Sequence, residues 1–352
     1  MPESNSKSQS QYQPQSSMAP LTTPSHTRRS VIQSSVGLAV MGLLQESLFA
    51  QSSTLENLRI VTGFSAGGTS DTLCRRLATK LAPDYAKSAV VDNKTGAGGQ
   101  IAIQYIKSQP VDGTVVLQSP TSMFTIYPHI YKKLPYDPVA DVTPVSVACV
   151  FDLVFAIGPM VPQSVKTLQD YLAWSKANPQ LANFGSPAAG STPHFVGMII
   201  GRLAGINYQH VAYRGSQPAM LDLLGGNLAA VSAPVGDVIQ HVSTGKVRML
   251  VVAGSKRSRF APDVPTFSDL GYKDMSYNEY FGIFLPPKAP VEVVNKLNAA
   301  LKIALASKEV IDGLGTFGLE SMSSTPQEFA DLIKRDTLKW EPIVKQVGFS
   351  AD

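Results

Sequence analysis

The sequence lacks the features that mark several large classes of protein. Of its 352 residues only two are cysteine and 16% are charged, with a formal net charge of +4. The basic residues are scattered rather than clustered, which argues against a nucleic-acid partner. After residue 50 no apolar stretch is long enough to cross a bilayer. We therefore expect the mature chain to be soluble and to bind no nucleic acid.

The common catalytic and metal-binding motifs are also missing. The sequence contains no G-x-S-x-G elbow and no H-E-x-x-H helix. Metal ligands recur at short spacings, but the histidines lie far apart, at His26, His129, His194, His210 and His241. The sequence gives no reason to expect an enzyme, a metal or a cofactor, although a site assembled from distant residues stays open.

The two cysteines, Cys74 and Cys149, are permitted to pair in an oxidising compartment. Cys74 falls in a helical pattern and Cys149 in an apolar, strand-like run. Nothing in the sequence brings them together, so we expect buried free thiols.

The first fifty residues have the three-part layout of an export signal. A polar lead is followed by Arg28 and Arg29, by a modestly apolar run from Val36 to Leu44, and by Ala50 at a suitable cleavage position. The paired arginines favour the twin-arginine route, but Val31 and Gln33 depart from that motif, so the route stays open. We expect residues 1–50 to be a signal peptide with a disordered lead, and the mature protein to be periplasmic.

Three loops rich in small residues follow short apolar runs. They cover Ile60–Asp71, Val90–Gln100 and Asn183–His194, and each runs into a helical pattern. Glycine lets a backbone approach a ligand closely, and the amides at a helix start favour anions. The first and third loops are over a hundred residues apart, which suggests one anionic ligand held from two sides. The second loop is neither a phosphate loop nor a dinucleotide fingerprint.

From residue 57 onward, strand and helix signals alternate. This rhythm is typical of parallel sheets covered by helices, with ligands at the carboxyl ends of the strands. Strands are predicted at 58–62, 89–92, 114–119, 145–150, 153–157, 182–185, 207–211, 231–233 and 247–253. Helices are predicted after the first loop and at 101–108, 168–177, 196–204, 218–224, 236–244, 291–307 and 326–347.

Several short motifs now match a known family in order and spacing. They are G-F-S-A-G-G-T-S-D at 63–71, V-V-D-N-K-T-G-A-G-G-Q-I at 90–101, Y-P-H-I-Y-K-K-L-P-Y-D-P at 127–138, Y-R-G-S-Q-P-A at 213–219, L-L-G-G-N at 223–227 and P-D-V-P-T at 262–266. Over residues 57–352 the chain resembles the extracytoplasmic solute receptors of tripartite tricarboxylate transporters, the Bug receptor family.

The resemblance implies an α/β fold, a two-lobed type II periplasmic binding protein with a hinge between two parallel-rich sheets. Its lobes would be residues 56–153 plus 278–352 and residues 154–277. It also implies a monomer that captures a small carboxylate, a di- or tricarboxylate or an aromatic acid, and delivers it to membrane transporter subunits. A receptor that reports its ligand to a sensor kinase is the alternative, and a hydrolase is a remote one.

The resemblance also places the ligand-binding residues. The first loop would contribute a wall of aromatic, amide and hydroxyl groups, with Asp71 bracing the loop. Hydroxyls after the third predicted strand and in the third loop would bind the carboxylate, and Tyr213 could close one side. The predicted contacts are Phe64, Ser65, Gly67, Gly68, Thr69, Ser70, Ser119, Thr121, Ser186, Ser191, Thr192, Tyr213 and Ala233.

Ala233 bears on specificity. Many relatives have an aspartate in a stretch reading F-D-S, where this chain has S-A-P and Ala233 at the aspartate position. A buried ammonium without a counter-charge is costly, so the resemblance implies a carboxylate ligand without an amine. Phe64, Phe124, Phe151 and Tyr280 are candidates for an apolar lining, with core packing as the alternative.

Overall fold

The computed structural model describes residues 54–273 and 275–351. The export signal predicted for residues 1–50 lies outside the described residues. None of the described helices combines the length and the apolar character that a membrane crossing requires.

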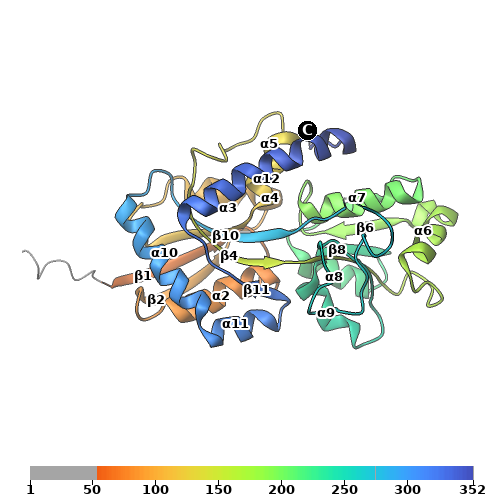
Figure 1. The fold of residues 1–352 in the computed structure, drawn as a ribbon, viewed down its shortest axis with the longest axis horizontal. Helices are drawn as coiled ribbons and strands as arrows, with labels where there is room; N and C mark the ends of the chain where they lie inside the picture. Colours follow the sequence, from red (N-terminus) through yellow and green to blue (C-terminus); the bar gives the residue numbers. More distant parts are fainter. Residues whose placement is uncertain (1–53, 274, 352) are drawn as a thin grey trace, which may run out of the picture. The chain divides into compact units, whose positions relative to one another are not determined.

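In the first sheet, β1, β2 and β3 lie together at one side. β1 pairs in parallel with β2 and β3, and β10 lies antiparallel between β3 and β4, with β11 beside β4. The sheet order is β11-β4-β10-β3-β1-β2 (Figure 1). Among the described residues, its six strands are β1 (Leu55–Thr62), β2 (Ala86–Asn93), β3 (Val115–Pro120), β4 (Thr143–Phe151), β10 (Glu279–Leu285) and β11 (Leu319–Ser321).

The second sheet repeats this plan with the middle of the chain. β6 pairs in parallel with β7 and β8, whereas β5 lies antiparallel between β8 and β9. β5 reads L-V-F-A-I and is buried throughout, as expected of a strand with neighbours on both sides. Within the described chain this sheet has five strands, β5 (Leu153–Ile157), β6 (Asn183–Ser186), β7 (Gln209–Ala212), β8 (Ala230–Pro234) and β9 (Arg248–Val252).

The helices follow the strands and begin at chemically suitable residues. Thr167 and Thr325 each form a capping box with an acid three residues later, which satisfies amides at the start of α6 and α12. α12 ends at Gly348 in the left-handed conformation. The helices are α2 (Thr69–Leu81), α3 (Gln100–Ile106), α4 (Ser122–Thr125), α5 (Tyr127–Ile130), α6 (Leu168–Ala177), α7 (Thr192–Ala204), α8 (Ser216–Leu224), α9 (Val235–Val242), α10 (Val291–Ala306), α11 (Lys308–Gly315) and α12 (Pro326–Val347).

The chain passes between the two sheets twice. β4 ends at Phe151 and β5 begins at Leu153, so one residue, Asp152, separates the sheets there. The return runs from Val252, the end of β9, to Glu279, the start of β10. β4 and β10 are neighbours in the first sheet, so the two passages lie side by side (Figure 1). Both sheets belong to one compact unit that begins at Thr54.

The alternation of strands and helices is as the sequence predicts, but each sheet is parallel only on one side. The antiparallel pairings are those of β10 with β3 and β4, of β11 with β4, and of β5 with β8 and β9. The chain leaves the first sheet through β4 and β5 and returns through β9 and β10, so the strands beside the two passages run in opposite directions. The sequence patterns did not predict β10, β11, α4, α5 or α11. β10 reads E-Y-F-G-I-F-L, an apolar run without alternation that periodicity cannot assign. Cys74 and Cys149 are buried free thiols, as predicted.

Candidate functional site

A cavity lies where loops from both sheets meet. Most of its lining residues follow the carboxyl ends of β1, β3, β6, β7 and β8, the usual place for ligands in open α/β sheets. The first sheet and its loops contribute Phe64, Ser65, Gly68, Thr69, Ser70, Pro120, Ser122, Met123, Phe151, Glu279 and Phe281. The second contributes Pro187, Ser191, Pro193, Gly215, Ser216, Pro234 and Asp237.

The two walls of the cavity are close together. The volume open to the centres of water-sized molecules is about 40 Å³, room for a few ordered waters. The Ser65 amide, on the wall from the first sheet, donates to the Arg214 carbonyl on the wall from the second sheet, at 3.0 Å. Gly215 has φ +124°, and a Cβ there would lie 2.4 Å from Ser65 Oγ, so this approach requires glycine. A larger ligand needs the walls to separate.

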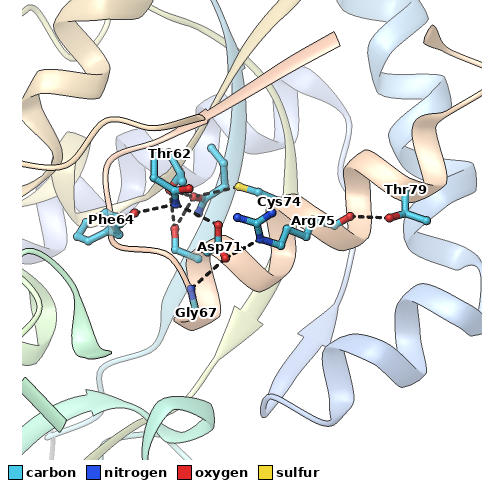
Figure 2. Close-up of polar contacts among 10 residues, drawn as sticks. Thr62, Phe64, Gly67, Asp71, Cys74, Arg75 and Thr79 are labelled. Atoms are coloured by element: carbon cyan, nitrogen blue, oxygen red, sulfur yellow. Dashed lines mark hydrogen bonds and ion pairs between the residues drawn. The ribbon is translucent and has the colours of Figure 1, made fainter. Parts of the chain in front are cut away.

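Asp71 braces the loop between β1 and α2, as the sequence analysis expects (Figure 2). Its carboxylate accepts hydrogen bonds from the Gly67 amide at 3.0 Å, Arg75 Nε at 2.8 Å and Asn93 Nδ2 at 3.0 Å. Asn93 also donates to the Phe64 carbonyl. Burial opposes ionisation, but these donors outweigh it and hold the pKa of Asp71 below its usual value. The carboxylate is therefore committed to the loop and not to a ligand.

The hydroxyl of Ser70 is committed to a buried polar network under the same loop. Gln118 Oε1 accepts from Thr62 Oγ1 at 2.7 Å and from Ser70 Oγ at 2.5 Å, and Cys74 Sγ lies 3.7 Å away. All four residues are buried. Ser70 borders the cavity, but its oxygen stabilises the strand–helix junction.

Asp237 joins the two walls. It lies in the first turn of α9, and its carboxylate accepts from the Thr69 amide at 2.8 Å and from Thr69 Oγ1 at 3.2 Å. Burial raises the pKa of Asp237 to about 6, against hydrogen bonds from Ser216 and Thr69 that favour its ionised form. The acid therefore occupies the start of α2, where backbone amides favour an anion.

Glu279 holds a similar position on the other side of the cavity. At the start of β10, its Oε1 accepts from the Ser122 amide at 2.8 Å and from Thr121 Oγ1 at 3.1 Å. Burial raises the pKa of Glu279 to about 7, although hydrogen bonds from Thr192 and then Ser122 and Thr121 oppose the shift. Thr192 comes from the second sheet's α7, so this acid also links the two walls.

Among the described residues that line the cavity, two buried hydroxyls have no hydrogen-bond partner, Ser65 Oγ and Ser122 Oγ. Ser122 Oγ lies near enough to the Glu279 carboxylate to lower its pKa, but without the geometry of a hydrogen bond. Ser122 is only 1% exposed, and a buried hydroxyl without a partner costs free energy. The cavity thus offers two donors that a ligand can satisfy. Within the described residues, no group of three or more histidine, cysteine or acidic side chains is arranged to hold a metal ion.

Comparison with known proteins identifies the family. The model of the tripartite tricarboxylate transporter family receptor matches residues 73–349. This chain belongs to that receptor family. Protein BugT of Bordetella pertussis is 29% identical over 292 residues, which are 83% of this chain and 89% of BugT.

Solved structures of periplasmic binding proteins share the fold. Rpa4515 of R. palustris, solved with adipate, superposes with a TM-score of 0.79 at 26% identity, over 84% of this chain and 98% of that one. The periplasmic binding protein BugD gives 0.78 at 26% identity over the same shares. The family and the two-lobed α/β fold predicted from the sequence are confirmed, and the receptor's relatives are solute-binding proteins.

The predicted contacts of this receptor divide into two groups. Those that line the cavity are Phe64, Ser65, Gly68, Thr69, Ser70 and Ser191. Among the aromatic candidates, Phe151 lines it too, whereas Phe124 packs on Phe284 in the core, with ring centroids 4.4 Å apart. Tyr280 does not appear in the lining of this cavity.

The remaining predicted contacts do not line this cavity, and the polar groups of most of them bond within the fold. The Gly67 amide holds Asp71, while Thr121 and Thr192 hold Glu279. Ser119 Oγ donates to the Pro120 carbonyl. Ser186 Oγ donates to the Ala188 carbonyl and lies 2.8 Å from His210 Nε2, and the Tyr213 hydroxyl donates to Asp222.

Ala233 also departs from its predicted place. It is fully buried on β8, opposite Val154 of β5, and belongs to the apolar core of the second sheet. Its neighbour Pro234 lines the cavity, because successive side chains of a strand point to opposite faces. Ala233 therefore does not leave the cavity without an acid, since Asp237 and Glu279 line it.

Lys94 and His194, in the second and third loops, have structural roles. Lys94, in the second loop, pairs with Asp92 at 3.2 Å and lies over the Tyr105 ring. His194 Nδ1 accepts from the Gly190 amide, and its ring stacks on His210 with centroids 3.7 Å apart. Burial, with a smaller effect of His210, lowers the pKa of His194 to about 3, so the imidazole is neutral.

Sequence reasoning missed the two acids of the cavity. For Asp237 a signal was present, because S-A-P-V-G-D continues an apolar strand into a helix, as F-S-A-G-G-T-S-D does at the first loop. Glu279 had no local signal. It precedes an apolar run that was not assigned, and only the pairing of β10 between β3 and β4 brings it beside Ser122.

Proposed function

We propose that this protein is an extracytoplasmic solute receptor that captures a small carboxylate in the cavity and delivers it to a tripartite-type membrane transporter. The observation that carries the proposal is the pair of unpartnered hydroxyls, Ser65 Oγ and Ser122 Oγ, in a cavity between two sheets. The adipate in Rpa4515 supports the ligand class, because that protein has the same fold at 26% identity.

The two passages between the sheets support a hinge. We propose that the lobes are residues 56–153 plus 278–352 and residues 154–277, and that they separate about Asp152 and the segment before Glu279. The small volume of the cavity requires such an opening before a ligand can enter. Ligand contacts from both lobes would then stabilise the closed state. We propose that the receptor acts in the periplasm as a monomer.

Calorimetry with a panel of carboxylates tests the binding function. Ser65→Ala and Ser122→Ala should each lower the affinity for a bound carboxylate about tenfold, because a hydrogen bond to a charged group contributes about 1.5 kcal/mol or more. The matched control is Ser70→Ala, since the Ser70 hydroxyl bonds Gln118 and should affect stability rather than affinity. A protein that binds no carboxylate in the panel would refute the function.

A second measurement tests closure and delivery. Small-angle scattering should show a smaller radius of gyration with a bound ligand than without it. Deleting the gene should abolish uptake of that ligand by cells, and expressing the receptor again should restore it. Unchanged uptake in the deletion strain would reject the transport role while leaving binding intact.

A further inference from the structure

The charge of the cavity is one-sided. Among the described residues that line it, the ionisable side chains are Asp237 and Glu279, and neither a lysine, an arginine nor a histidine is present. The two acids come from different walls, one from α9 and one from β10. Any ligand in this cavity therefore meets acidic groups without a basic side chain to offset them.

The two acids already occupy the amides that suit a carboxylate. Asp237 takes the Thr69 amide at the start of α2, and Glu279 takes the Ser122 amide beside α4. A second carboxylate on a ligand would have to displace one of these acids or lie beside it. Like charges at a shared site raise the free energy strongly unless one is protonated.

The donors that remain suit one polar end of a ligand. Ser65 Oγ and Ser122 Oγ are unpartnered, whereas both acids already accept hydrogen bonds from the protein. The lining also includes the aromatic rings of Phe64, Phe151 and Phe281, which suit a hydrocarbon or aromatic body.

We propose that Asp237 and Glu279 set the charge that the cleft accepts, so that this receptor takes an apolar or aromatic monocarboxylate in preference to di- and tricarboxylates. The inference rests on the proposed function and narrows its ligand class. The single carboxylate lies between the Ser65 and Ser122 hydroxyls, and the body of the ligand lies against the phenylalanine rings.

The environment of the acids supports this assignment. Burial raises the pKa of Glu279 to about 7 and that of Asp237 to about 6, so one proton suffices to offset one incoming anion near neutral pH. Tyr127 and Tyr280 are the described ionisable side chains that interact electrostatically with Glu279. Burial raises the pKa of both tyrosines, so they are neutral. Asp237 is held by Thr69 of α2 and Ser216 of α8, which do not titrate.

Paired ligands test the inference on the purified protein. Calorimetry at pH 7.5 should compare hexanoate with adipate, and benzoate with phthalate. The first member of each pair should bind about tenfold more tightly or better, because it brings one negative charge instead of two. Equal or tighter binding of adipate and phthalate would overturn the inference and leave the receptor function standing. Failure of every ligand would refute both.

Variants then assign the selectivity to the acids. Glu279→Gln and Asp237→Asn should each reduce the preference for hexanoate over adipate about tenfold, through a gain in adipate affinity. The control is Glu309→Gln, an exposed acid of α11 outside the cavity, which should leave the preference unchanged. Unchanged preference in both folded cavity variants would contradict the assignment.

The unmodified protein gives a second readout that does not depend on the variants folding. Hexanoate should bind more tightly at pH 6 than at pH 8, with uptake of a proton detected by calorimetry in buffers of different ionisation enthalpy. Binding without proton uptake, at an affinity that is constant over this range, would overturn the role of the acids.

Discussion

Asp71 and Asp237 occupy equivalent positions in the two halves of the molecule. Each is the third residue of a helix that follows the carboxyl end of a parallel strand, β1 for Asp71 and β8 for Asp237. Asp71 has Arg75 one turn away and a lowered pKa. Asp237 has only neutral donors, and burial raises its pKa. The same local position thus gives a carboxyl group with a lowered pKa in one half and one with a raised pKa in the other.

The difference arises from the partners and not from the helix. A helix start favours a carboxylate equally in both halves. Arg75 supplies a charge only to Asp71, because an arginine four residues later on the same helix faces the same side. The residue four positions after Asp237 is His241, and Asp237 bonds instead to Thr69 across the cavity. In the second half, the acid therefore links the two walls of the cavity.

The largest expected effect comes from placing an acid where it finds neither a charged partner nor neutral hydrogen-bond donors. Ala233→Asp puts a carboxylate into the apolar core of the second sheet, and we expect a loss of about 4 kcal/mol in the free energy of unfolding. Urea unfolding followed by circular dichroism measures it, with Ala233→Val as a control for size. A loss below about 1 kcal/mol, together with weaker dicarboxylate binding, would mean that residue 233 faces the ligand and not the core.

A smaller effect is expected when the charged partner of the first half is lost. In Asp71→Ala the Gly67 amide and Asn93 lose an acceptor, whereas the largely exposed Arg75 is rehydrated. We expect unfolding to become easier by about 2 kcal/mol. Arg75→Ala is the matched variant and should cost less, because the neutral donors remain. Equal losses in both variants would show that the ion pair alone holds the loop.

The smallest effect concerns the opposite pH dependence of the two aspartates. A raised folded pKa gives Asp237 a stabilising contribution at low pH that is lost as pH rises through about 6. Asp71, with its lowered pKa, contributes above its unfolded pKa and loses that contribution in acid. Asp237→Asn should therefore remove about 1 kcal/mol of the stability that the protein loses between pH 5 and pH 8.

Unfolding curves at both pH values measure this difference. Asp71→Asn is the control, because its effect belongs to more acidic solutions and should leave the change between pH 5 and pH 8 as it is. An unchanged pH dependence in Asp237→Asn would mean that the acid is ionised in the folded state at pH 5.

Several residues named from the sequence line the cavity. The loop over residues 63–71 lines the cavity through Phe64, Ser65, Gly68, Thr69 and Ser70, and the third loop does so through Ser191. These residues are close in sequence to the end of a strand, so their position follows from local structure. Ser186 and Tyr213 are as close to strand ends, but their polar groups bond to His210 and Asp222, which local patterns do not reveal.

The sequence by itself determined the alternation of strands and helices, the family and the loops that line the cavity, because these depend on periodicity, glycine and short motifs. Tertiary structure alone decided the charge of the cleft. Asp237 and Glu279 are 42 positions apart and belong to different sheets, and they line one cavity only because the chain passes between the sheets twice. Their ionisation depends on burial and on donors such as Thr69 and Ser122, which fold against them from distant segments.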